Sequence, residues 1–107
     1  MSTESKRKKG DLALLLEKST GGPITLGKLL EAIRLGEELT QPQFAKKLGI
    51  TKSHLNDIEK GRKSVSPERA AKFAMILKYS PTRFVALSLQ AMIDQAGLKL
   101  HVELRAA

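Results

Sequence analysis

The stretch from Leu39 to Gly61 reads LTQPQFAKKLGITKSHLNDIEKG, and its residue pattern is the clearest indication of the fold. Thr40 and Gln43 stand three residues apart, the spacing at which a capping hydroxyl and an amide satisfy each other's backbone N–H groups at the start of a helix. The helix that begins there ends at Gly49, because glycine adopts the left-handed C-terminal conformation at the least cost. The pattern predicts two short helices separated by a tight glycine turn.

The second of these helices begins after Thr51 and has only two apolar positions, Leu55 and Ile58. The rest of its surface can donate or accept hydrogen bonds and consists of Lys52, Ser53, His54, Asn56 and Asp57. A helix with a narrow buried stripe and a polar, partly basic front suits insertion into the major groove of DNA. The stretch therefore predicts a helix-turn-helix motif whose second helix reads DNA.

The same residues resemble the Cro/CI (XRE-like) helix-turn-helix family, from about Leu26 to Leu77. The matching segments are Thr40-Gln41, Phe44-Ala45, Leu48-Gly49-Ile50-Thr51 and Ile58-Glu59-Lys60-Gly61. The resemblance implies an all-α, five-helix DNA-binding domain over residues 25–95, with Arg34 at a commonly basic position of the first family helix. It also implies a regulator of transcription, expected to be a repressor, in the cytoplasm of a bacterial or phage-type system and associated with the nucleoid.

Helical periodicity and start signals support the other three helices. Thr25 precedes apolar residues at helical spacing, and Ser66-Pro67 and Ser80-Pro81 each combine a cap with a proline in the first turn. The predicted core helices run from residue 26 to 35, from 67 to 77 and from 82 to about 95.

Residues 1–24 contain two segments that differ in composition. The basic run KRKK at residues 6–9 is expected to be either an arm that follows the DNA backbone or a solubilising tail. Four leucines between residues 12 and 16 form a piece too short to be a stable helix alone, so it must dock on the core or on a partner.

After Gly97 the hydrophobic period changes to two, because four apolar residues alternate with charged residues and a histidine. The apolar residues are Leu98, Leu100, Val102 and Leu104. This alternation predicts a short C-terminal β-strand over residues 96–107 whose partner is on another polypeptide, since a lone strand leaves its backbone unpaired. Antiparallel pairing of two copies about His101 would place Lys99 opposite Glu103, and would make these residues a dimerisation element.

Two classes of DNA contact are predicted for the motif. The residues expected to reach base edges are Lys52, Ser53, Asn56 and Asp57. Lysine suits guanine and asparagine suits adenine, whereas the Asp57 carboxylate either accepts from cytosine or pairs with a neighbouring lysine. The residues expected to contact the DNA backbone are Gln41, where the resemblance implies a backbone contact, with Thr51, His54, Lys60, Arg62 and Lys63. His54 is open to either class, Thr51 also serves as a cap, and Glu59 is expected to be structural.

Composition supports this assignment. The formal net charge is +8, and residues 40–63 and 64–83 carry +4 and +3 of it, which favours a double-stranded DNA partner. With two histidines and no cysteine, the chain offers no visible catalytic set, so we expect no enzyme activity, cofactor or metal. No apolar run is long enough to span a membrane, so no membrane partner is expected.

One alternative remains open. Short Cro/CI-like chains with extra terminal segments resemble HigA-like antitoxins, which bind a toxin protein and regulate their own operon. The leucine segment at residues 12–16 and the predicted C-terminal strand are pieces that a toxin could order. In that case the chain would still bind DNA as a homodimer.

Overall fold

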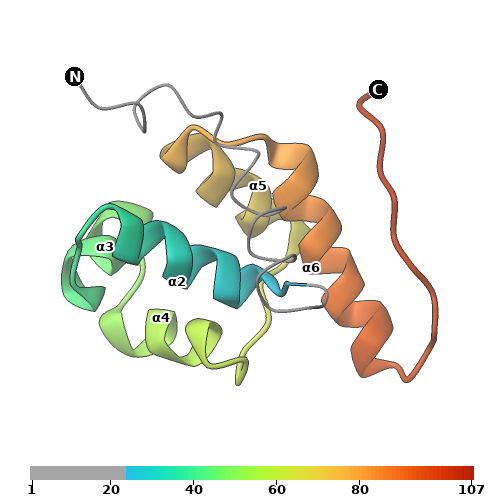
Figure 1. Ribbon diagram of the computed structural model, residues 1–107, viewed down its shortest axis with the longest axis horizontal. Coiled ribbons are helices and arrows are strands. Elements are labelled where there is room, and N and C mark those ends of the chain that lie inside the picture. The colour runs from blue at the N-terminus through green and yellow to red at the C-terminus, as the bar shows by residue number, and fades with distance from the viewer. Residues whose placement is uncertain (1–23) are drawn as a thin grey trace.

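The computed structural model describes residues 24–107, and within them the chain forms five helices arranged around one apolar core (Figure 1). In chain order these are α2 (Leu26–Gly36), α3 (Gln41–Leu48), α4 (Lys52–Glu59), α5 (Pro67–Leu77) and α6 (Pro81–Gln95). The predicted all-α, five-helix fold is therefore confirmed for this part of the chain. The basic run and the leucine segment predicted before residue 24 lie outside the described residues.

Local side-chain hydrogen bonds fix where the helices begin. At α3, the Thr40 hydroxyl accepts from the Gln43 backbone N–H at 3.3 Å while the Gln43 side chain accepts from the Thr40 N–H at 2.9 Å, so the predicted capping box is present. Thr25, Thr51 and Ser66 cap α2, α4 and α5 in the same way with one bond each. Ser80 stands at the predicted cap of α6 but makes no side-chain cap bond.

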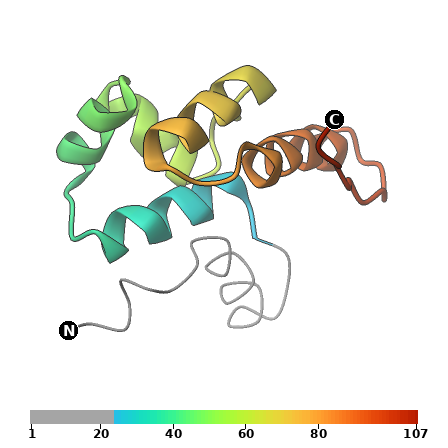
Figure 2. The ribbon, with the colours of Figure 1, turned by 90° about the horizontal axis from the view of Figure 1, so that it is seen from above.

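Every helix contributes a fully buried apolar side chain to the core. These are Leu30 from α2, Phe44 from α3, Leu55 from α4, Phe73 from α5 and Phe84 from α6. The α5 helix packs mainly against α6, and α3 packs mainly against α4. Viewed from above, α3 and α6 lie at opposite ends of the molecule, with α2 running between them (Figure 2). The start of the helix-turn-helix and α6 therefore present separate surfaces.

The crossing of α2 and α4 depends on one glycine. Gly27 is buried in the first turn of α2, and a Cβ added there would overlap the backbone carbonyl oxygen of Ile58 in α4. Because a backbone carbonyl cannot rotate away as a side chain can, only glycine lets these two helices approach so closely. Gly27 thus sets the position of the C-terminal turn of α4.

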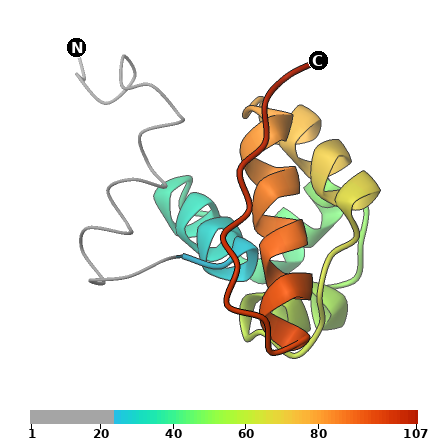
Figure 3. The same ribbon diagram turned by 90° about the vertical axis from the view of Figure 1, so that its right-hand side faces the viewer.

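The predicted C-terminal strand is not seen in this single copy, because residues 98–107 have no regular secondary structure. Residues 98–104, which we call the C-terminal strap, run back along α6 after the chain reverses at Gly97 (Figures 1 and 3). A strand needs a second strand to pair with, and the described part of the chain contains none. The Gln90 side chain of α6 bonds to the strap instead, donating to the Leu100 carbonyl and accepting from the Val102 N–H, each at 2.8 Å.

Candidate DNA-binding interface

The first turn of α4 presents the two leading candidates for base contact. Lys52 and Ser53 are both exposed there, immediately after the Thr51 cap, whose hydroxyl accepts from the His54 backbone N–H at 3.1 Å. Leu55 and Ile58 are buried on the opposite side of the helix. The narrow apolar stripe predicted from the sequence is therefore present, and it turns the polar front of α4 outward.

Gln41 and Asn56 are joined within the interface. The Gln41 side-chain amide donates to Asn56 Oδ1 at 3.1 Å and to Glu59 Oε1 at 3.0 Å. Since a glutamine amide has two N–H groups, both donors of this side chain are engaged inside the protein. The bond also fixes the orientation of the Asn56 amide. Its oxygen faces Gln41, so its nitrogen must lie on the side away from Gln41. The first turn of α3 and the middle of α4 thus form one rigid unit.

An ion pair beneath this unit connects it to α2. Arg34 Nε lies 2.8 Å from Glu59 Oε2, a second guanidinium nitrogen lies 3.1 Å from Glu59 Oε1, and Arg34 also donates to the Leu39 carbonyl at 3.1 Å. The Glu59 side chain is only 2% exposed, so its charge is out of water and depends on these partners. The hydrogen bond to Glu59 raises the pKa of Arg34, which keeps the guanidinium charged. Glu59 is structural, as predicted.

Asp57 faces the basic loop that follows α4. Its carboxylate lies 3.3 Å from Arg62 Nη1 and 4.0 Å from Lys63 Nζ, and its backbone carbonyl accepts from the N–H groups of both residues. The pairing with a neighbouring lysine, one of the two alternatives considered for Asp57, is thus present together with an arginine. These contacts hold the loop against the end of α4, where Lys60 is also exposed.

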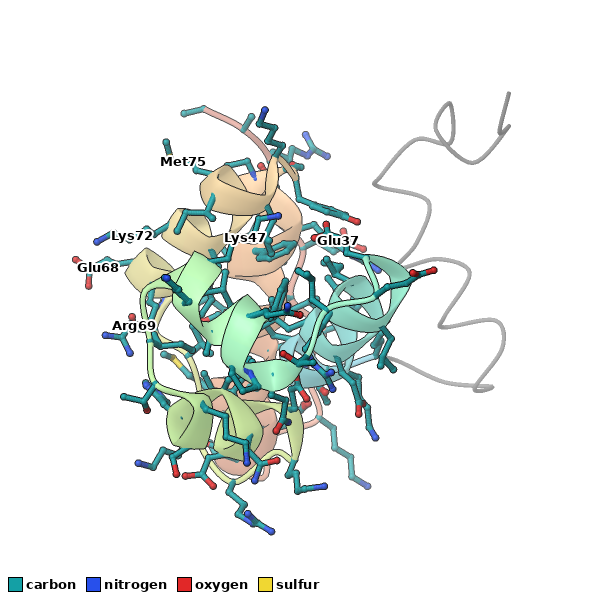
Figure 4. The ribbon with its side chains drawn as sticks, turned by 90° about the vertical axis from the view of Figure 1, so that its left-hand side faces the viewer. Glu37, Lys47, Glu68, Arg69, Lys72 and Met75 are labelled. Carbon is teal, nitrogen blue, oxygen red and sulfur yellow. The ribbon has the colours of Figure 1, made fainter. Side chains whose placement is uncertain are left out.

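Further positive charge lies on α5. Arg69 and Lys72 are exposed on this helix beside the acidic Glu68, and Met75 is 70% exposed one turn further along (Figure 4). Lys47 of α3 is directed toward Glu37, and the two side chains form an ion pair of 3.2 Å (Figure 4). Part of the basic excess predicted to serve DNA is therefore balanced by neighbouring acids.

The four predicted dimerisation residues lie apart from the DNA-contact candidates, on the strap beside α6 (Figure 3). Val102 is half-buried, whereas Leu98, Leu100 and Leu104 are 50%, 60% and 37% exposed. The residue that organises this region, Gln90, is absent from the sequence-based predictions. No local pattern marks it, since its partners are ten and twelve residues further along the chain.

The described region contains neither a cluster of metal ligands nor a helix that could span a membrane. No three side chains of the types that ligate metals come together anywhere in residues 24–107. None of the helices from α2 to α6 combines the length and the apolar character that crossing a bilayer requires.

The comparisons with known proteins agree with this geometry. A family model described as helix-turn-helix matches residues 30–84, slightly more than half of the 107-residue chain. No curated protein and no solved structure matches the chain. The matched range begins in α2 and ends in α6, so it contains the complete capped motif and the ion pair that supports it. The chain belongs to the Cro/CI-type (XRE-like) helix-turn-helix family of DNA-binding transcriptional regulators.

Proposed function

We propose that the protein represses transcription by binding an inverted-repeat operator as a homodimer, with α4 of each copy in the major groove. The observation that carries this proposal is the exposed, polar first turn of α4. The helix is held in place by Glu59, to which both Gln41 and Arg34 donate hydrogen bonds. A preorganised reading helix loses little conformational freedom on binding, so its contacts contribute more of their energy to affinity.

The base contacts are assigned to four residues of α4. Lys52 suits guanine O6 and N7, and Ser53 beside it can bond to either base of a pair. Asn56 suits adenine, and its bond from Gln41 fixes which way its amide faces. Asp57 can reach cytosine N4 only if its ion pairs with the basic loop loosen on binding.

The backbone contacts are assigned to both flanks of α4. On one flank Gln41 offers its backbone N–H to a phosphate at the start of α3, because its side-chain donors are engaged and the capping box already uses the N–H groups of Thr40 and Gln43. The remaining phosphate contacts come from Thr51, His54, Lys60, Arg62 and Lys63. The lysines and arginine of the second flank follow the last turn of α4 directly.

Two alanine substitutions separate the two classes of contact. Lys52→Ala is expected to reduce the binding free energy by about 1–3 kcal/mol and to relax the preference at a single base position. Lys63→Ala should weaken binding to all sequences and lower the slope of log affinity against log salt concentration by about one. Titration of operator and random DNA at several salt concentrations measures both effects. Equal effects of the two substitutions on both kinds of DNA would contradict the division.

A homodimer is proposed because one helix reads only a few base pairs, and two copies on an inverted repeat read enough for specificity. The half-sites would lie about one helical turn apart. The strap is the proposed dimer contact, since three of its four apolar side chains are exposed. Pairing of two straps about His101 would bring Lys99 of each copy opposite Glu103 of the other.

A second candidate function is that of an antitoxin that binds a toxin protein and regulates its own operon. The exposed leucines of the strap favour it, because a partner protein would cover them as well as a second copy would. The two functions predict different oligomeric states for the purified protein. A repressor that uses the strap for self-association is a dimer at micromolar concentration, whereas an antitoxin that reserves the strap for a toxin leaves it unpaired.

A further inference from the structure

Gln90 of α6 bonds to the middle of the strap through both ends of its side-chain amide. Gln90 Nε2 donates to the Leu100 carbonyl oxygen at 2.8 Å, and Gln90 Oε1 accepts from the Val102 N–H at 2.8 Å. The carbonyl of one residue and the N–H of the residue two positions further are the two groups that a neighbouring strand would engage. The Gln90 amide therefore takes the place of a strand on this edge of the strap.

Asp94 fixes the orientation of the Gln90 amide. Gln90 Nε2 also donates to Asp94 Oδ1 at 2.9 Å, one helical turn along α6. A carboxylate accepts and cannot donate, so it selects the nitrogen of the amide and turns the oxygen toward Val102. Asp94 and Gln90 thus recognise one carbonyl and one N–H of the strap and discriminate against the reversed order.

The occupied edge determines which backbone groups remain for a partner. In an extended segment successive residues direct their N–H and C=O groups to opposite sides. Since Leu100 and Val102 face Gln90, the backbone groups of Lys99, His101 and Glu103 face away from α6. All three of these residues are exposed, and none of their backbone groups bonds to another described residue.

We infer that Gln90 is a positioning residue that closes one edge of the strap and leaves the other to pair with the strap of a second copy. This inference rests on the homodimer proposed above and specifies which edge of the strap the two copies share. Two antiparallel straps that pair through the open edges form their hydrogen-bonded pairs between odd-numbered residues, because only those carry outward backbone groups.

Charge then selects one register among those that the open edge allows. With the two-fold axis at His101, Lys99 lies opposite Glu103 of the other copy, and this pair occurs twice. With the axis at Val102, Lys99 would lie opposite Arg105, and with the axis at Leu100 it would lie opposite His101, so neither register pairs Lys99 with an acid. Opposite charges across a strand pair stabilise it and like charges destabilise it, so pairing about His101 is favoured.

The chain contains no cysteine, so single cysteines can report the register. We expect His101→Cys to form an intermolecular disulfide at least ten times faster under mild oxidation than Leu100→Cys or Val102→Cys. The reason is that only residue 101 lies opposite its own copy, at the Cα separation of about 5.5 Å that a disulfide accepts.

Removing the Gln90 amide should then slow this cross-linking. In the Gln90→Leu background nothing holds the Leu100 and Val102 backbone groups toward α6, so the odd-numbered groups are no longer held outward and the His101→Cys rate is expected to fall at least about five-fold. Gln95→Leu is the matched control, because Gln95 is an exposed glutamine of the same helix whose side chain makes no bond to the strap. In this control the His101→Cys rate should be unchanged.

Three results would overturn the inference. A dimer that cross-links fastest at residue 100 or 102 contradicts the register, and a His101→Cys rate that Gln90→Leu leaves unchanged contradicts the role of Gln90. A protein that sediments as a monomer contradicts the homodimer and with it this inference. In the first two cases the proposed dimeric regulator stands, so the failures are distinguishable.

Discussion

Replacing Arg34 by methionine is expected to lower the free energy of unfolding by about 3–5 kcal/mol, because it leaves the Glu59 carboxylate buried without its cation. Methionine retains much of the length of the side chain, so the loss is mainly electrostatic. Urea denaturation followed by circular dichroism measures the change. Operator binding should fall as well, since Glu59 also anchors the Gln41 amide that orients Asn56.

The Lys47–Glu37 ion pair is the matched control for this substitution. Its N–O distance is 3.2 Å, but the two side chains are 43% and 34% exposed, so water already solvates both charges. Lys47→Met is expected to change stability by less than about 1 kcal/mol. The double variant Arg34→Met, Glu59→Leu should be more stable than Arg34→Met alone, because no unpaired charge remains in the core. If Arg34→Met costs no more than Lys47→Met, the ion pair does not hold the motif together.

Gly27→Ala is expected to destabilise the protein by about 1–3 kcal/mol, although alanine normally favours a helix over glycine. The new methyl group would overlap the Ile58 carbonyl oxygen, so α2 and α4 must move apart. That movement displaces the last turn of α4 and the basic loop behind it, and DNA affinity should therefore fall together with stability.

Gly36→Ala provides the comparison within the same helix. Gly36 is the last residue of α2, and an added Cβ there meets nothing within 4 Å. This substitution should leave stability unchanged or raise it by up to about 1 kcal/mol. Thermal unfolding of the two variants measures the contrast. Equal effects of the two substitutions would show that the close crossing at Gly27 is unimportant.

Sequence reasoning predicted most of the fold because helix starts and turns are local. The spacing of Thr40 and Gln43 contains the whole geometry of the capping box, and Gly49 at φ 78° takes the left-handed conformation that ends α3. The burial of Leu55 and Ile58 followed from their spacing in the same way. Each of these features depends on residues within one or two helical turns.

The C-terminal region could not be predicted because its contacts depend on a chain reversal. The alternation from Leu98 to Leu104 shows only that the segment has two different faces, and it does not identify what lies beside it. After the reversal at Gly97, the strap meets Gln90, which no pattern distinguishes from any other helical glutamine. Arg34 and Glu59, 25 residues apart, were each noted in the sequence, but their bidentate pairing required the packing of α2 on α4.

The exposed front of α4 is proposed to read an inverted repeat as part of a dimer. Selection of DNA fragments from a random pool, followed by affinity measurements at two salt concentrations, tests this proposal. We expect enrichment of an inverted repeat bound with a dissociation constant of about 10 nM or tighter at physiological salt. Binding that is weak, indifferent to sequence and abolished by moderate salt would contradict the claim.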